Sequence, residues 1–156
     1  MARQSTERME RATSTSVNRR IEAEIMASIE YHMAYPDEID QRLKELEEEW
    51  DIERVLQANA SALAFLGTAL GLLSGRRWLL LPAAVSAFLF QHATQGWCPP
   101  LPVLRRLGFR TAHEIAQEYY ALKAIRGDFA EVKAGADNAE AALVAVGLRK
   151  GRKKKG

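Results

Sequence analysis

The sequence predicts an all-α protein: a two-span transmembrane helical hairpin flanked by cytosolic amphipathic helices. Two neighbouring apolar runs, 55–75 and 78–104, carry no charged residue, and only Arg76 and Arg77 separate them. A run of about 20 such residues is long enough for one helix to cross the hydrocarbon core of a bilayer. Because the connection is so short, the two helices must run antiparallel. We therefore expect a transmembrane hairpin over 55–104.

Charge is unevenly distributed along the chain, although the net charge of +2 is small. Acidic residues concentrate in 37–53, whereas 149–155 is almost wholly basic. The 156 residues leave room for one small domain or for one hairpin with appendages. The single cysteine excludes an internal disulfide framework and a zinc site with several thiolates. Residues 1–54 contain no apolar segment typical of a cleavable signal, so the first span is expected to direct insertion itself.

The N-terminal third predicts a polar start followed by two amphipathic helices. Residues 1–15 are rich in Ser, Thr and Arg, a composition typical of disorder. Over 16–54, apolar residues recur every three or four positions on either side of Pro36, which predicts a cytosolic helical pair. The second helix has no stop signal before Val55 and is expected to continue into the first span. The two stripes are Ile21, Ile25, Ile29 and Met33, and then Ile39, Leu43, Leu46 and Trp50.

These two apolar stripes can be covered in three ways. The helices can pack against each other, pair as a coiled coil with a second copy of the chain, or lie on a lipid surface. The acidic character of 37–53 argues against tight contact with anionic lipid, so the surface alternative ranks last.

Small residues line one face of the first span. Gly67, Gly71 and Gly75 follow one another at intervals of four, a spacing that lets helix backbones approach closely in lipid. This face either packs the hairpin onto itself, which we favour, or forms a contact between two copies. Trp78 and Trp97 lie at opposite ends of the second span, as expected of residues at the two membrane interfaces.

Polar residues inside the spans predict a contact across the hairpin. Counted outward from the turn, Asn59 and His92 fall at the same depth. Buried polar groups in lipid are costly unless they are paired, so we expect these two side chains to hydrogen-bond and fix the register. A proton or ligand site at His92 is the alternative. His92 is too isolated for a metal site, and no metal is expected.

Basic residues around the spans predict the orientation. Seven of them flank the outer ends of the hairpin, against two in the turn, which favours cytoplasmic termini for this multi-pass chain. The seven are Arg42, Lys44, Arg54, Arg105, Arg106, Arg110 and Lys123.

A proline-rich elbow and another helix follow the second span. Three prolines within 99–102 forbid a regular helix and restrict the residues before them. Thr111 and Glu114 have the spacing of a capping box, in which each side chain bonds the other residue's backbone N–H. We therefore expect a cytosolic helix within 105–128, with Gly127 as its stop signal. Its apolar stripe is Ile115, Tyr119 and Leu122.

The elbow also carries a family resemblance. Gly96, Cys98 and Pro99, then Gly108 and Thr111, follow a two-span hairpin in a pattern that resembles the YgaP-like transmembrane domain. The likeness covers about residues 54–111. It implies a helical hairpin in the bacterial inner membrane, sometimes dimeric and sometimes attached to a rhodanese domain, and matches Cys98 and Pro99 to the family's cysteine and proline. This chain has no rhodanese-like catalytic loop of its own.

Cys98 has two interpretations. A single cysteine at a membrane interface is typically a small, inert residue. If Arg105 and Arg106 fold back onto it, they would lower its pKa and make it a reactive thiol.

The C-terminal segment, 129–156, predicts a weak helix over 139–146 and a basic tail. The tail residues Arg149–Lys155 could contact anionic lipid, nucleic acid or the acidic segment 37–53. No RNA- or DNA-binding motif accompanies them, so nucleic acid is a poor candidate.

The motifs point away from catalysis. The sequence contains no paired nucleophile and base, no metal-ligand cluster and no glycine-rich phosphate loop, so we expect neither an enzyme nor a cofactor. The first hypothesis is a non-enzymatic membrane anchor or adaptor, with lipid, a second copy, or a membrane or cytosolic protein as partner. The second is a sulfur-relay or redox accessory acting through Cys98. A soluble helical bundle is the third.

Overall fold

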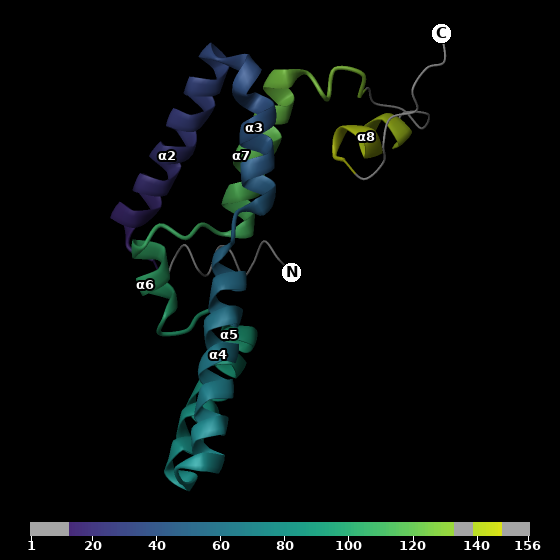
Figure 1. Cartoon of the computed structure of the whole chain (residues 1–156). Coiled ribbons are helices and arrows are strands. Elements are labelled where there is room, and N and C mark those ends of the chain that lie inside the picture. The colour runs from purple at the N-terminus through teal and green to yellow at the C-terminus, as the bar shows by residue number, and fades with distance from the viewer. Residues whose placement is uncertain (1–12, 133–138, 148–156) are drawn as a thin grey trace. The chain divides into compact units, whose positions relative to one another are not determined.

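The computed structural model describes residues 13–132 and 139–147, and every regular element in these ranges is helical (Figure 1). The prediction of an all-α protein is therefore confirmed. The basic tail, Arg149–Lys155, lies outside the described residues, as does most of 1–15. The elements are α2 (Thr15–Ala34), η1 (Pro36–Glu38), α3 (Ile39–Glu48), α4 (Ile52–Leu73), η2 (Arg76–Leu79), α5 (Leu80–Gln95), α6 (Leu101–Arg106), α7 (Ala112–Arg126) and α8 (Ala139–Ala145).

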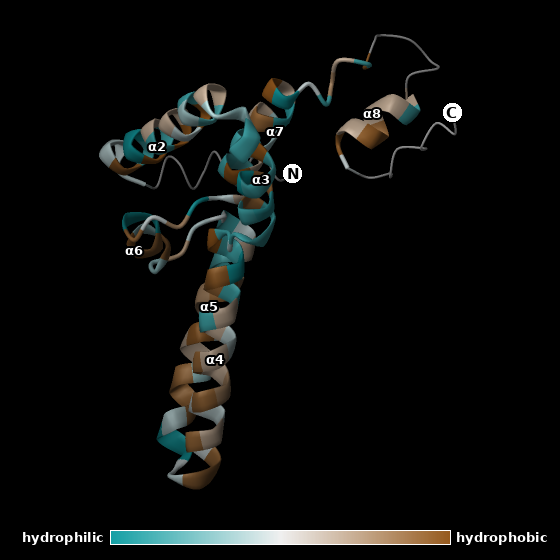
Figure 2. Ribbon diagram, turned by 45° about the horizontal axis from the view of Figure 1, so that its top comes forward, coloured by the Kyte–Doolittle hydropathy of each residue, from teal (hydrophilic) through white to brown (hydrophobic). Residues whose placement is uncertain are grey.

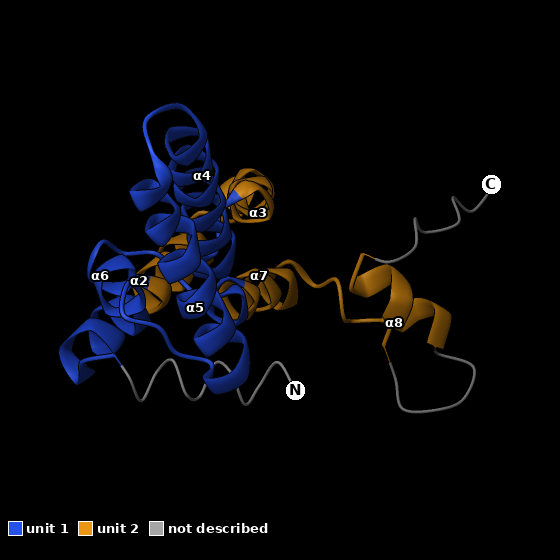
Figure 3. Ribbon diagram, turned by 90° about the horizontal axis from the view of Figure 1, so that it is seen from below, with its two compact units in different colours: residues 1–24, 49–115 blue, residues 25–48, 116–156 orange. Residues whose placement is uncertain are grey.

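The chain divides into two compact units that are not continuous in sequence (Figure 3). Unit 1 comprises 1–24 and 49–115, and unit 2 comprises 25–48 and 116–156. The helices α2 and α7 contribute residues to both units.

Unit 1 is built on the antiparallel pair of α4 and α5, which lie side by side and are joined through η2 (Figure 1). Apolar residues dominate both ribbons in Figure 2. Among the described residues, one stretch, Pro36–Leu73, is long and apolar enough to cross a membrane, and its apolar part is α4. With 22 residues, α4 is about 33 Å long, which exceeds the roughly 30 Å of a hydrocarbon core.

The second apolar run ends as a helix before the proline-rich elbow, where the sequence predicts that a regular helix is interrupted. With 16 residues, α5 is about 24 Å long and ends at Gln95, where Gly96 takes a left-handed conformation. After the elbow the chain forms a separate short helix, α6. Pro100 is its N-cap and Pro102 lies in its first turn, where a missing N–H breaks no intrahelical hydrogen bond. The prolines therefore start a new helix here, which the sequence analysis did not foresee.

A break separates α3 from α4, although the sequence suggested one continuous helix. Asp51 caps α4 by accepting a hydrogen bond from the backbone N–H of Arg54 at 2.7 Å. The backbone N–H of Ile52 donates to the carbonyl oxygen of Arg110 at 2.9 Å. Arg110 in turn forms an ion pair with Glu49. The start of α4 is thus held by the segment that precedes α7.

The core of unit 1 lies where α4, the elbow and α6 meet. Its buried members are Ile52, Leu56, Cys98 and Leu101, and the partly buried side chains of Leu104 and Phe109 pack against them. In unit 2, Ile39, Leu43 and Leu46 of α3 are buried, as predicted. Trp50 is not part of that stripe: it lies beyond α3, is exposed, and stacks under the guanidinium of Arg54 at 4.3 Å.

The predicted apolar stripe of α2 is buried at the start of the helix but not at its end. Ile21 and Ile25 are buried, whereas Met33 is exposed and His32 is buried in its place. A four-residue step turns an α-helix by about 400°, so a four-residue repeat moves round the helix by about 40° at each step. After three steps Met33 has left the face of Ile21.

Candidate functional sites

The two inner glycines of α4 allow close packing within the hairpin. A Cβ atom added at Gly67 would lie 2.6 Å from Cδ of Pro82, and one added at Gly71 would collide with the side chain of Leu79. Gly75 lies in the turn with φ of 133°, where added side-chain atoms would meet nothing within 4 Å. Gly67 and Gly71 therefore face α5 and η2 of the same chain, and Gly75 serves the turn.

Asn59 and His92 do not form the expected hydrogen bond. The Asn59 amide donates to the carbonyl oxygen of Val55 in its own helix at 2.8 Å. The buried Nδ1 of His92 has no hydrogen-bond partner among the described residues. The prediction of an Asn59–His92 pair is therefore wrong, because a short amide side chain can bond to the carbonyl one turn back instead of crossing the helix interface.

Cys98 lies in the elbow beyond α5, with 1% of its surface exposed. Burial raises the pKa of its thiol above the ordinary value. Arg105, which could have lowered it, points to Glu114 instead. The structure thus places the thiol in an apolar core and provides no cationic neighbour from Arg105.

Arg105 is the centre of a buried network in unit 1. Its guanidinium is fully buried and donates to both carboxylate oxygens of Glu114, at 2.6 and 2.8 Å, and to Oδ1 of Asn18 at 3.0 Å. Burial alone would raise the pKa of Glu114, but the hydrogen bonds from Arg105 and Thr111 outweigh it and lower the pKa below the ordinary value. The pair holds α6 against the start of α7.

The capping box before α7 is formed as predicted. The Thr111 backbone N–H donates to Oε2 of Glu114 at 2.7 Å, and the Glu114 backbone N–H donates to Oγ1 of Thr111 at 3.2 Å. Gly108, at φ of 95°, makes the turn that leads into this motif. Gly127 ends α7 with φ of 91°, also as predicted. Glu114 therefore closes the capping box, as the sequence predicts, and it also pairs with Arg105, which the sequence did not predict.

An apolar cavity of about 460 Å³ lies in unit 1 beside the elbow. Leucine, alanine, valine and phenylalanine side chains of α4, α5 and α6 form most of its wall, and Cys98 and Asn59 contribute to it.

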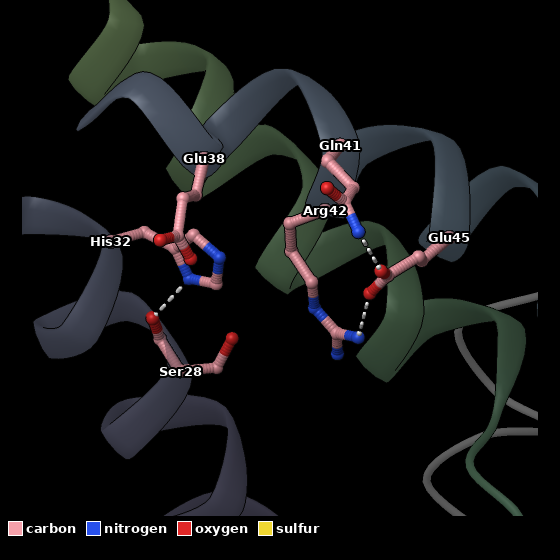
Figure 4. A pocket seen from close by; sticks show the side chains of 6 residues that line it. All are labelled: Ser28, His32, Glu38, Gln41, Arg42 and Glu45. Carbon is pink, nitrogen blue, oxygen red and sulfur yellow. Dashed lines mark hydrogen bonds and ion pairs between the residues drawn. The ribbon is translucent and has the colours of Figure 1, made fainter. Parts of the chain in front are cut away.

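Unit 2 contains a polar pocket of about 350 Å³ between α2, η1 and α3 (Figure 4). Three of its lining side chains, Glu38, Gln41 and Glu45, are exposed to solvent. Its lining residues are Ser28, His32, Glu38, Gln41, Arg42 and Glu45.

A buried carboxylate anchors this pocket. Glu118 of α7 is fully buried and accepts hydrogen bonds from Nε of Arg42 at 2.9 Å and from Oγ of Ser28 at 2.6 Å. Glu118 was not among the residues that the sequence pattern singled out. The available signal was its place three residues after Ile115 and four before Leu122, inside the apolar stripe of α7, where an acidic residue must be paired.

The pocket is not suited to a metal ion. Among the described residues, no three His, Cys, Asp or Glu side chains lie close enough together to hold one. The arrangement instead offers several hydrogen-bond acceptors around a space large enough for a small molecule.

No family model, curated protein or solved structure matches this chain significantly. The resemblance to the YgaP-like transmembrane domain accordingly stays a prediction.

Proposed function

We propose that this chain is a non-enzymatic membrane anchor whose α4–α5 hairpin crosses the bilayer and whose amphipathic helices bind protein partners in the cytoplasm. The observation that carries the proposal is the exposure of large apolar side chains on the hairpin. Phe65 is 76% exposed and Leu73 is 84% exposed, and Leu72, Leu80 and Phe90 are exposed to a similar degree. An apolar surface of this kind on a folded chain calls for lipid or protein to cover it.

The lengths of the helices are compatible with two crossings if η2 counts as part of the second. The four residues of η2 and the 16 of α5 together reach about 32 Å. The guanidinium groups of Arg76 and Arg77 would lie at the outer interface, to which arginine side chains extend readily. Exposed Trp78 at the same level fits an interfacial position.

The excess of basic residues outside the hairpin supports cytoplasmic termini, and the family resemblance supports the bacterial inner membrane. The partner would be a cytosolic or membrane protein, or a second copy of the chain. The burial of Cys98 supports anchoring over thiol chemistry, because a nucleophilic cysteine needs both exposure and thiolate character.

Single cysteines in a Cys98→Ala background test the topology. We would place them before α4 (Glu48→Cys), in the turn (Ser74→Cys) and after α6 (Leu107→Cys). Accessibility to a membrane-impermeant maleimide is then compared in intact cells and in inverted vesicles.

Two crossings place the first and third cysteines on one side and the turn on the other. If the turn and Leu107→Cys share a side opposite to Glu48→Cys, only α4 crosses, and the hairpin proposal fails. If all three label from the same side, the chain does not cross the membrane.

A further inference from the structure

The polar pocket of unit 2 contains a buried histidine with one ring nitrogen unused. His32 is 8% exposed, and its Nδ1 lies 2.6 Å from the backbone carbonyl oxygen of Ser28. Because a carbonyl oxygen only accepts hydrogen bonds, Nδ1 must carry the proton and donate it. In the neutral ring Nε2 is then an acceptor. Figure 4 shows this second nitrogen on the side of the ring that faces away from Ser28 and into the pocket.

The one guanidinium in the pocket is already neutralised. Arg42 donates to Oε1 and Oε2 of Glu118, at 2.9 and 3.3 Å, and to Oε2 of Glu45 at 3.2 Å. The positive charge of Arg42 is thus compensated by the buried carboxylate of Glu118 and by the exposed carboxylate of Glu45. Arg42 therefore does not offer a free positive charge to an incoming anion.

Carboxylates outnumber cationic side chains at this pocket, while its uncharged lining residues Ser28 and Gln41 donate hydrogen bonds to Glu118 and Glu45. Glu38, Glu45 and Glu118 supply three carboxylates against the single guanidinium of Arg42, which leaves a formal charge of −2 on these four side chains. The hydrogen bonds from Arg42 and Gln41 lower the pKa of Glu45 below its ordinary value, so that this carboxylate is ionised at neutral pH. A carboxylate has about four lone-pair positions, so Glu38 and Glu45 retain capacity beyond their present bonds.

We propose that this pocket binds a small organic cation that carries ammonium groups. An ammonium group is a compact charge with three donors, which matches Nε2 of His32 and the carboxylates of Glu38 and Glu45. The volume of about 350 Å³ is at the lower end of small-molecule sites, and the spacing of the acidic groups excludes a directly ligated metal ion. This inference does not depend on membrane insertion, because every group in it belongs to unit 2.

Titration of the purified full chain with the diamine putrescine, followed by calorimetry and by the NMR signals of the His32 ring, tests the proposal. We expect saturable binding that shifts the His32 signals, and no binding of the neutral diol of the same length. Glu38→Gln and Glu45→Gln keep the shape of the pocket and should each weaken binding up to about fivefold, the scale of an exposed charged contact.

Two matched variants separate the pocket from general acidity. Glu30→Gln on α2 and Glu48→Gln on α3 remove exposed carboxylates outside the pocket and should leave the affinity unchanged. The proposal is overturned if putrescine does not bind, if the His32 signals do not move, or if all four variants weaken binding equally. Far-ultraviolet circular dichroism of each variant verifies that the helices are retained.

Discussion

At the scale of single residues, two buried charged side chains form ion pairs between segments that are separate in sequence. Arg105 and Glu118 are both fully buried, and each forms an ion pair: Arg105 with Glu114 and Glu118 with Arg42. Taking such a group out of water costs several kcal/mol unless a partner compensates it. Removing one member of a pair is therefore more harmful than removing an exposed charge.

The variant Glu114→Gln measures this effect. Gln can still close the capping box, but it leaves the buried guanidinium of Arg105 without a counter-charge. We expect a loss of about 3 kcal/mol in the free energy of unfolding, measured by denaturation of the full chain. Glu24→Gln is the control, because it breaks the exposed Arg20–Glu24 pair and should cost about 0.5 kcal/mol or less. Equal losses in the free energy of unfolding would contradict the prediction that the buried ion pair contributes more to stability than the exposed one.

The same pair predicts a pH dependence. Because the folded chain lowers the pKa of Glu114, its contribution to stability is fully present above the ordinary glutamate pKa of about 4.3. The contribution is lost as the pH falls through the lower pKa of the folded state. The difference in melting temperature between the native chain and Glu114→Gln should therefore shrink below about pH 4.

Cys98 should react slowly with maleimide. It is almost fully buried, and burial raises the pKa of its thiol, so that little thiolate exists at neutral pH. The cysteine introduced by Ser74→Cys, at an exposed position, is the reference for the labelling rate. We expect Cys98 to approach that rate only after denaturation. Rapid labelling of the native chain would favour the alternative in which this thiol takes part in chemistry.

At the scale of elements, the spacing of small residues determines how closely α4 and α5 approach. Gly67 faces the rigid ring of Pro82, whereas Gly71 faces Cγ and Cδ2 of Leu79, a side chain that can change its rotamer. The elbow is the second such element, since its prolines lie where a new helix can begin rather than where one must stop.

Two alanine substitutions should differ in their cost. Gly67→Ala places a Cβ against the Pro82 ring, which cannot move without shifting α5, and should destabilise the hairpin by about 1–3 kcal/mol. Gly71→Ala should be nearly neutral, because Leu79 can rotate away and alanine favours helix by roughly 0.5–1 kcal/mol over glycine. Thermal unfolding in detergent compares them, with Ser61→Ala at an exposed position of α4 as the control. Equal losses of stability in Gly67→Ala and Gly71→Ala would contradict the expected difference between the Pro82 ring and the Leu79 side chain.

At the scale of the whole molecule, the location of the exposed apolar surface matters most. The hairpin of unit 1 exposes leucine and phenylalanine side chains along its length, while the charged residues of unit 2 form hydrogen-bonded ion pairs. In the proposed arrangement, a bilayer would cover the apolar surface of the hairpin.

The variant Phe65→Lys distinguishes a membrane from water around α4. In a bilayer, a lysine near the middle of the span costs about 2.5–3.5 kcal/mol, so the fraction of protein that resists alkaline extraction from membranes should fall. In water the same change at an exposed position would be harmless. Met33→Lys, also at an exposed position but on α2, should not alter extraction. An unchanged Phe65→Lys variant would contradict the anchor proposal.

The sequence alone determined the helical class, the long apolar helix, the capping box at Thr111 and the stop at Gly127, because these follow from composition and from contacts within one or two turns of chain. Only the tertiary structure decided that a new helix, α6, begins at the prolines, that Asn59 bonds within its own helix, that Cys98 is buried and that Arg105 pairs with Glu114. These outcomes depend on which distant side chains meet, and a periodic pattern does not encode that. The pocket around His32 belongs to the same class, since its groups come together only when α2, α3 and α7 pack within unit 2.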